Sequence, residues 1–149
     1  MTLSRRKLLS SSVAAAVSTF FGGRVFADVE SVQKAIAEYT GGSDSPYDNL
    51  IEFKLPEIAE NGHSVPVSVS VKSAMTTEDY VDSVMIFSGG NPNPEVATFF
   101  FSPLSGEARV STRMRLGRTQ NVSVIAKLSD GTFHRTNRFV AVTVGGCGV

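Results

Sequence analysis

Cysteine is nearly absent from this chain, because Cys147 is the only one in 149 residues. A single cysteine cannot form an intrachain disulfide, which excludes a fold held together by a disulfide framework. The two histidines, His63 and His134, have no ligand spacing, and a metal site would require them to converge with carboxylates or with Cys147. We interpret them as solvated or locally hydrogen-bonded histidines and predict no metal. The sequence also has no CxxC pair, nucleophile elbow or phosphate-binding loop.

Long hydrophobic runs are missing as well. The most apolar stretch, residues 13–21, is interrupted by serine and is too short to cross a membrane as a helix. It follows Ser4-Arg5-Arg6-Lys7 and precedes Val25-Phe26-Ala27, which has small residues at positions −3 and −1 of a cleavage site. These parts predict an export signal over residues 1–27 that is cleaved after Ala27. The paired arginines are typical of the twin-arginine route, so we expect a periplasmic protein.

An excess of positive charge is also lacking. The chain has 14 basic and 14 acidic side chains, and removal of the predicted signal takes away Arg5, Arg6, Lys7 and Arg24. The remaining negative balance argues against a nucleic-acid partner and gives no reason to expect binding to an anionic membrane. Outside the reducing cytosol, the unpaired Cys147 is then either a free, reactive thiol or joined to something outside the chain.

The body of the chain, residues 28–144, has the pattern of a small β domain. A helix is predicted at about residues 29–39, ended by Thr40-Gly41-Gly42. From Leu50 onward, alternating apolar residues predict seven strands: about 50–55, 65–71, 81–87, 96–101, 108–116, 122–128 and 132–144. Short, evenly spaced strands without a βαβ rhythm favour an all-β fold, an immunoglobulin-like antiparallel β-sandwich with a short N-terminal helix.

The last five residues, Gly145-Gly146-Cys147-Gly148-Val149, predict a flexible arm that carries a thiol. An ordinary thiol, with a pKa of about 8.5, is only about 3% thiolate at pH 7. No neighbour in the tail activates Cys147 or supplies a base. The tail therefore favours a passive attachment point that other proteins load, and it argues against a cysteine enzyme.

A row of arginines is a second candidate site. Arg109, Arg113 and Arg115 alternate with apolar residues in the segment 108–116, and Arg118 follows. A period of two places the first three on one face of a strand. Because the guanidinium group binds carboxylates and oxyanions, this face is a candidate contact for an acidic partner or an oxyanion. The simpler interpretation, which we favour, is a solvated outer face.

The sequence resembles the SoxY family, the sulfur carriers of the periplasmic thiosulfate-oxidising Sox system, over nearly its whole length. The resemblance includes the twin-arginine start and the segments 38–42 (EYTGG), 55–62 (LPEIAENG), 65–67 (VPV), 91–94 (NPNP), 111–116 (STRMRL), 129–131 (SDG) and 142–148 (VTVGGCG). One position departs from the family tail, which usually ends Gly-Gly-Cys-Gly-Gly and here ends in Val149.

This resemblance implies that Cys147 holds thiosulfate-derived sulfur covalently, without a separate cofactor. It implies loading by a c-type cytochrome, release of sulfate by a hydrolase, and oxidation of the remaining sulfur by a sulfane dehydrogenase. It also implies a heterodimer with a small β partner, SoxZ. Two alternatives stay open from the residues: an exported interaction module that dimerises through a Cys147 disulfide, and an enzyme that binds an oxyanion with Arg113 or Arg115.

Overall fold

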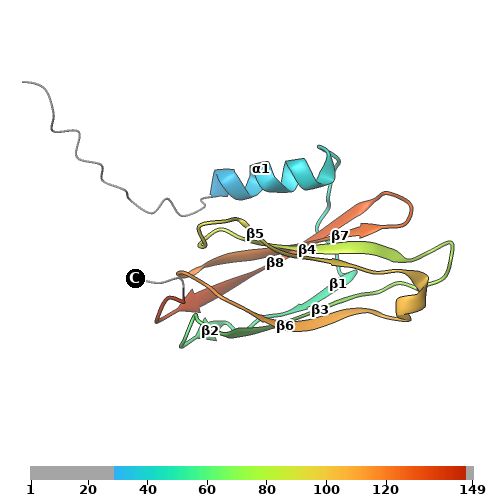
Figure 1. Cartoon of the computed structure of the whole chain (residues 1–149). Helices are drawn as coiled ribbons and strands as arrows, with labels where there is room; N and C mark the ends of the chain where they lie inside the picture. The colour runs from blue at the N-terminus through green and yellow to red at the C-terminus, as the bar shows by residue number, and fades with distance from the viewer. Residues whose placement is uncertain (1–28, 147–149) are drawn as a thin grey trace, which may run out of the picture.

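The computed structural model describes residues 29–146. A single helix, α1 (Val29–Thr40), is followed almost entirely by strands (Figure 1). These are β1 (Ile51–Lys54), β2 (Ile58–Ala59), β3 (Val65–Val71), β4 (Val81–Ser88), β5 (Glu95–Phe100), β6 (Ala108–Met114), β7 (Gln120–Leu128) and β8 (Phe133–Val142), with a 3₁₀ turn at Pro103–Ser105. Among these residues no helix is long and apolar enough to span a membrane. The predicted export signal lies outside the described residues.

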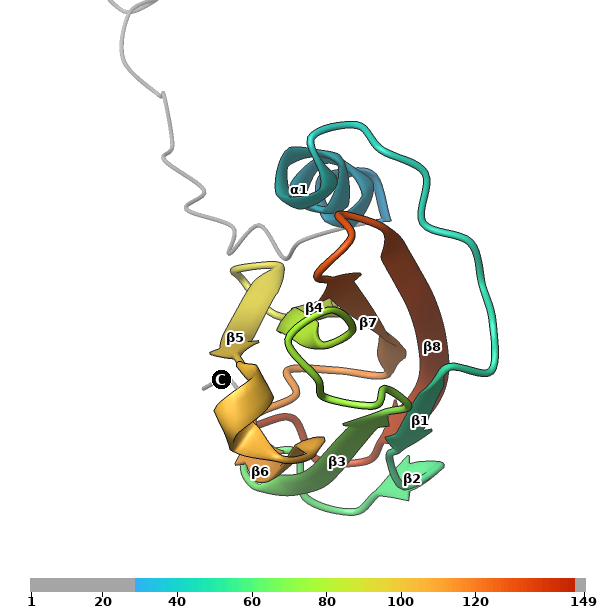
Figure 2. The same cartoon turned by 90° about the vertical axis from the view of Figure 1, so that its right-hand side faces the viewer.

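The strands form two sheets that face each other. One contains three strands in the order β1-β3-β6, and the other contains five in the order β2-β8-β7-β4-β5. Viewed end-on, edge strands β5 and β6 lie on one side of the sandwich, and β1 lies near β8 on the other (Figure 2). The predicted all-β sandwich with a short N-terminal helix is confirmed.

One strand escaped the sequence pattern. We expected residues 56–63 to be a connection, but β2 pairs with β8, and it does so in parallel, with Ile58 opposite Ala141 and Ala59 opposite Val142. Two residues are too few to show an alternation, so no period-two signal exists for such a strand. The structure therefore has eight strands rather than about seven. The last strand ends at Val142, two residues earlier than predicted.

The two sheets differ in pattern because only one has a covered outer face. In β3 the valines at positions 65, 67, 69 and 71 are each at most 5% exposed, whereas the intervening residues face outward. The inner strand β4 is instead buried on both faces. Its inward side chains Val84 and Ile86 join the central core, whereas Met85 and Phe87 pack beneath the helix.

Helix α1 covers the outer face of the five-stranded sheet (Figure 2). Val32 and Ile36, one turn apart on the same face of the helix, are buried against that sheet. Tyr39 places its ring edge-on to Phe87 and Phe133, at centroid separations of 6.0 and 5.9 Å, and its hydroxyl is 2.9 Å from Ser83 Oγ. The helix ends where Gly41 and Gly42 adopt positive φ angles of 61° and 80°, which glycine reaches without strain.

The start of β7 anchors the loop that follows β4. The buried side chain of Gln120 accepts hydrogen bonds from Ser88 Oγ and from the Gly90 amide, the latter at 2.7 Å. Its own amide group donates to the carbonyl of Arg118 at 2.9 Å. One side chain thus links the loop 88–91 to the segment that leads from β6 into β7.

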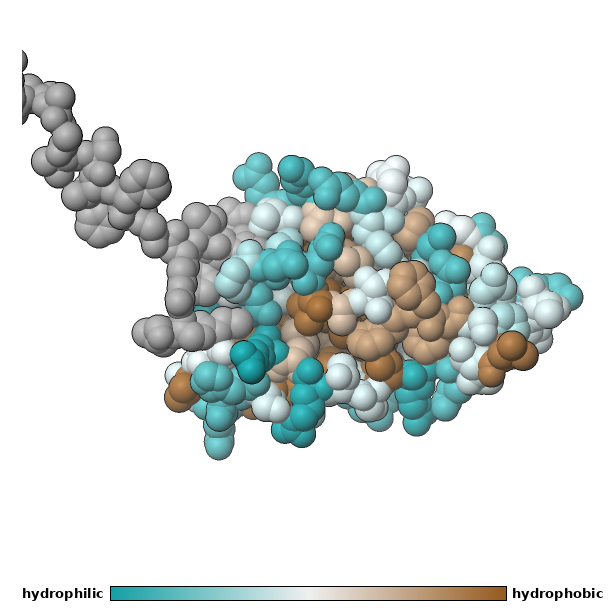
Figure 3. All heavy atoms as spheres, in the orientation of Figure 1, coloured by the Kyte–Doolittle hydropathy of each residue, from teal (hydrophilic) through white to brown (hydrophobic). Residues whose placement is uncertain are grey.

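The side of the sandwich between edge strands β5 and β6 is apolar. Val96, Phe99, Phe101 and Val110 are only partly buried there, although they pack against the core. Apolar surface is visible along this side in the space-filling view (Figure 3). Phe100 and Leu104, at the end of β5 and just after it, are 78% and 98% exposed.

Replacement of Tyr39 by Phe should lower the free energy of unfolding by about 1 kcal/mol, because it removes the hydroxyl that bonds to Ser83 but keeps the ring contacts. Chemical denaturation of both proteins measures this difference. Tyr80→Phe is the matched control, since the Tyr80 hydroxyl makes no hydrogen bond within residues 29–146. Equal losses for the two variants would contradict a contribution from the Tyr39–Ser83 bond.

Replacement of Gln120 by Leu should cost more, about 2–3 kcal/mol, because it leaves the Ser88 hydroxyl and the Gly90 amide without their buried acceptor. The same change at the exposed Gln33 of α1 should stay within about 0.5 kcal/mol. Thermal unfolding of the two variants beside the parent chain compares them. A Gln120→Leu protein as stable as Gln33→Leu would contradict this role.

Candidate functional site

The chain that leads toward Cys147 is anchored as soon as β8 ends. Thr143 donates its amide to the carbonyl of Ala59 at 3.1 Å, and its hydroxyl donates to the carbonyl of Glu60 at 2.7 Å. Ala59 is the last residue of β2 and Glu60 follows it, so the parallel pairing of β2 with β8 brings both acceptors there. The predicted tail therefore begins from a position fixed by two hydrogen bonds, one from the backbone and one from the side chain of Thr143.

Beyond Thr143, three segments of backbone meet, and we call this contact the glycine junction. It contains Gly62, the pair Leu116-Gly117 after β6, and the segment Val144-Gly145-Gly146. The Gly62 amide donates to the Val144 carbonyl at 2.7 Å, and the Leu116 amide donates to the Gly62 carbonyl at 2.8 Å. The Gly146 amide donates to the Leu116 carbonyl at 2.8 Å. The hydrogen bonds join the tail, the β2–β3 loop and the β6–β7 segment in one network.

Glycine is required in this junction by space. A Cβ atom at Gly62 would approach the Leu116 carbonyl oxygen to under 3.0 Å, and one at Gly145 would do the same with the Gly117 carbonyl oxygen. At Gly146 it would overlap the Gly62 carbonyl. All three obstacles are backbone atoms, which cannot rotate away as a flexible side chain can. Gly62 and Gly146 are both buried.

Asn91 holds the Leu116-Gly117 part of the junction through its side chain. Its side-chain amide donates to the Arg115 carbonyl at 2.8 Å, and its side-chain oxygen accepts from the Gly117 amide at 2.9 Å. Both bonds hold the segment whose middle residue, Leu116, accepts the hydrogen bond from Gly146. Asn91 opens the NPNP segment that the sequence singled out without a physical reason.

Only part of the predicted arm is described. Cys147, Gly148 and Val149 lie outside the described residues, so the attachment point stays a prediction. Gly145 and Gly146, which we expected to give the arm its freedom, both lie in the glycine junction. Sequence reasoning missed the partners Gly62 and Gly117. A glycine in each of the two loops was the available signal, but nothing in the sequence placed these loops beside the tail.

The arginine row does not converge on one site. Arg109 and Arg113 lie on edge strand β6, opposite Ser70 and Pro66 of β3, and both side chains are exposed. Arg109 forms an ion pair with Glu107 at 3.0 Å, and Arg113 donates to the Ser64 hydroxyl at 2.6 Å and to its carbonyl at 3.2 Å. Arg115 follows the end of the strand and is also exposed. Arg118 donates to the Gly89 carbonyl at 3.4 Å.

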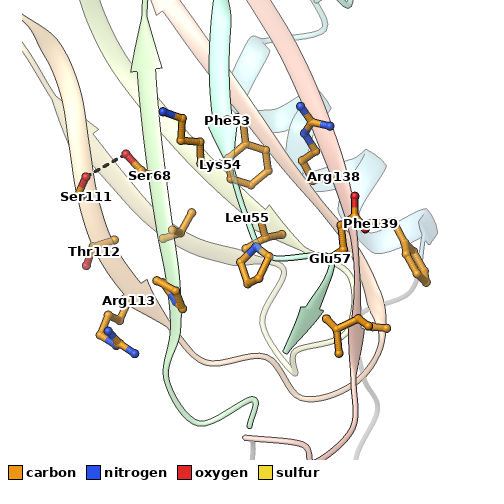
Figure 4. A pocket seen from close by; sticks show the side chains of 15 residues that line it. Phe53, Lys54, Leu55, Glu57, Ser68, Ser111, Thr112, Arg113, Arg138 and Phe139 are labelled. Atoms are coloured by element: carbon orange, nitrogen blue, oxygen red, sulfur yellow. Dashed lines mark hydrogen bonds between the residues drawn. The ribbon is translucent and has the colours of Figure 1, made fainter. Parts of the chain in front are cut away.

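A groove of about 1180 Å³ crosses the outside of the three-stranded sheet and reaches β2 and β8. Of the arginine row, only Arg113 lines it, and Arg138 of β8 lines it as well (Figure 4). The two side chains lie on opposite sides of the groove, with Phe53 and Leu55 between them. Lys54, also in this lining, is paired with Glu52 at 2.9 Å. No pattern in the sequence singled out Arg138.

The histidines are placed as locally bonded or solvated groups. His134 Nδ1 is hydrogen bonded to Asp48 Oδ2, and His63 is an exposed loop residue beside the junction. Within residues 29–146, no three His, Cys, Asp or Glu side chains gather in a way that could hold a metal ion. Cys147 lies outside these residues.

Comparison with known proteins agrees with the architecture. A chain described as the sulfur carrier protein SoxY from Chlorobium limicola is 35% identical, with a TM-score of 0.63, and the match covers 76% of this chain and 96% of that one. A putative superoxide reductase from Thermotoga maritima is 17% identical, with a TM-score of 0.57 and coverage of 66% and 93%. A superoxide reductase from Ignicoccus hospitalis is 14% identical, with a TM-score of 0.56 and coverage of 62% and 78%. At such identities the two reductases share the fold alone.

No curated protein matches the sequence. The family of the sulfur oxidation protein SoxY matches residues 36–147, most of the described chain and Cys147 beyond it. The matched range includes the last five residues of α1, every strand and the glycine junction, and the 35% identical SoxY structure agrees with it. The chain belongs to the SoxY family of sulfur oxidation proteins.

Proposed function

We propose that this protein is a periplasmic sulfur carrier, which holds thiosulfate-derived intermediates covalently on Cys147 and presents them to the enzymes of the Sox system. The observation that carries the proposal is the SoxY family match, which extends to Cys147 itself. The similar protein from Chlorobium limicola is described as a sulfur carrier, which supports the same role here. Cys147 is the single cysteine of the chain, so no other thiol competes for the substrate.

In the proposed loading step, the sulfur of Cys147 and the outer sulfur of thiosulfate form an S–S bond. Two electrons pass to a c-type cytochrome and the thiol proton passes to solvent, which gives a cysteine S-thiosulfonate. A hydrolase then adds water across the bond between the sulfane sulfur and the sulfonate group. Sulfate leaves, and a persulfide remains on Cys147. A sulfane dehydrogenase then oxidises that remaining sulfur to a sulfonate while it is still attached; three water molecules supply the oxygen atoms, six protons pass to solvent and six electrons pass to a cytochrome acceptor.

The division of labour follows from the tail sequence. Oxidative formation of an S–S bond requires a thiolate and an electron acceptor. The tail Gly-Gly-Cys-Gly-Val supplies neither a base to form the thiolate nor an electron acceptor. The partners therefore activate the thiol and accept the electrons, and this chain contributes the sulfur atom and its position. On this basis the protein is a covalent substrate handle rather than an enzyme.

The proposal includes a small β partner of the SoxZ type. The large apolar side chains of Phe100 and Leu104 are exposed to solvent, and the side of the sandwich between β5 and β6 is apolar. Apolar surface of this kind is typical of protein–protein contacts, which supports the existence of such a partner.

Intact mass spectrometry of the chain from cells grown on thiosulfate should show sulfur-containing adducts, which a thiol reductant removes. Cys147→Ser should carry none and should abolish sulfur oxidation, because no other thiol is present. Adding Thr77→Cys to that variant is the matched control, since position 77 is exposed and lies at the opposite end of β3 from the junction. We expect this displaced thiol to remain unloaded.

Two results would contradict the carrier function. One is a wild-type chain found only as a disulfide-linked homodimer, with sulfur oxidation intact in Cys147→Ser, as an interaction module predicts. The other is turnover of thiosulfate by the isolated chain, as expected for an oxyanion-binding enzyme.

A further inference from the structure

We propose that the glycine junction and Asn91 are positioning devices: they fix the backbone immediately before Cys147 against the end of the sandwich. The backbone is then fixed up to Gly146, which we call the root of the arm. The freedom that the sequence predicted from Gly145 onward begins only after this residue. This inference rests on the proposed carrier function for its purpose. Its structural content concerns only described residues and can be tested without any sulfur compound.

The first argument comes from space. If glycine were present at positions 145 and 146 only for flexibility, the tail would make no contacts there. Another small residue could then replace either glycine at little cost. Here a Cβ atom at either position would meet a backbone carbonyl at under 3.0 Å. The absence of side chains allows close backbone approach, the second common reason for glycine. Gly62, far away in sequence, is subject to the same constraint from the other side of the contact.

The second argument comes from hydrogen bonding. The Gly146 amide, one residue before the cysteine, donates to Leu116, whose own amide donates to Gly62. Gly62 in turn donates to Val144, which closes the network on the tail itself. Asn91 holds both neighbours of Leu116, through the Arg115 carbonyl and the Gly117 amide. Three other segments of the chain, around residues 62, 91 and 116, thus determine where Gly146 lies.

A fixed root limits how far the sulfur can travel. Consecutive Cα atoms are about 3.8 Å apart, so the Cα of Cys147 stays within that distance of the held Gly146. A partner enzyme must therefore bring its reaction centre to the end of the sandwich, where the loops around residues 62, 91 and 117 meet. Fixing the root in advance also reduces the backbone entropy that is lost when a partner docks.

Amide hydrogen exchange tests the root directly in the purified, reduced chain. If the network holds, the Gly146 amide should exchange on the order of tenfold or more slowly than an unstructured glycine, and Gly62 should be protected with it. Exchange of Gly146 at the unstructured rate would overturn the inference. This result does not depend on Cys147 chemistry, so a protein that never binds sulfur can still show a fixed root.

Asn91→Ala tests the brace, because it removes both bonds to the segment 115–117 without introducing a clash. Asn93→Ala is the matched control, since Asn93 is exposed and lies two residues further along the same loop. A nitroxide label on Cys147, the only cysteine, should become several-fold more mobile in Asn91→Ala and stay unchanged in Asn93→Ala. The measurement is made well below the melting temperature of either variant, where both are folded. A change in overall stability alone would therefore not make the label move faster.

Equal label mobility in both variants would overturn the role of Asn91. Gly146→Ala extends the test to the junction, where the added methyl group should displace the tail and free the label further. If either substitution prevents folding, amide exchange in the unaltered chain decides the matter. If the Gly146 amide is protected from exchange but Cys147 takes up no sulfur, the carrier function is refuted. The fixed position of Gly146 is supported in that case.

Discussion

The approach of three backbone segments at the glycine junction is the constraint on which this molecule depends. A Cβ atom at Gly62, Gly145 or Gly146 would come closer than 3.0 Å to a backbone atom of another segment, and at Gly145 that atom is the Gly117 carbonyl oxygen. Hydrogen bonds in a closed network then hold the tail to the β2–β3 loop and to the segment after β6. Each participant is the end or the neighbour of a strand, so the sandwich brings these segments together at one end.

The rest of the fold provides a rigid frame for that end. The three-stranded sheet supplies β3 and β6, whose ends lie next to the junction because Val65 pairs with Met114. The five-stranded sheet supplies β8, which leads into the tail. Strand β2 pairs with β8 in parallel beside it. Helix α1 covers the outer face of that sheet, and its Tyr39 packs on Phe87 and Phe133. Gln120 and Asn91 then fix the loop after β4 against the segment between β6 and β7.

The sequence predicted those features that are local or periodic. Alternation of period two identified β3 and β6, and the glycines after Thr40 correctly marked the end of the helix. The two-residue β2 was missed because it is shorter than one period, and the glycine junction was missed because its three segments are distant in sequence. The arginine row was recognised as a strand face, but the hydrogen bonds of Arg113 to Ser64 join residues 49 positions apart, which periodicity does not specify. Glycines 145 and 146 show the same limit, because composition suggested freedom whereas tertiary contacts hold them.

The central claim is that thiosulfate is joined to Cys147 through an S–S bond while a partner protein accepts the electrons. Its most direct test is the electron yield in a mixture of the purified chain, thiosulfate and the c-type cytochrome that loads it. Formation of one S–S bond per chain should reduce the cytochrome by about two electrons per Cys147 and then stop until the adduct is removed. Continued reduction beyond that amount in the absence of the hydrolase, or the same yield from Cys147→Ser, would contradict the account.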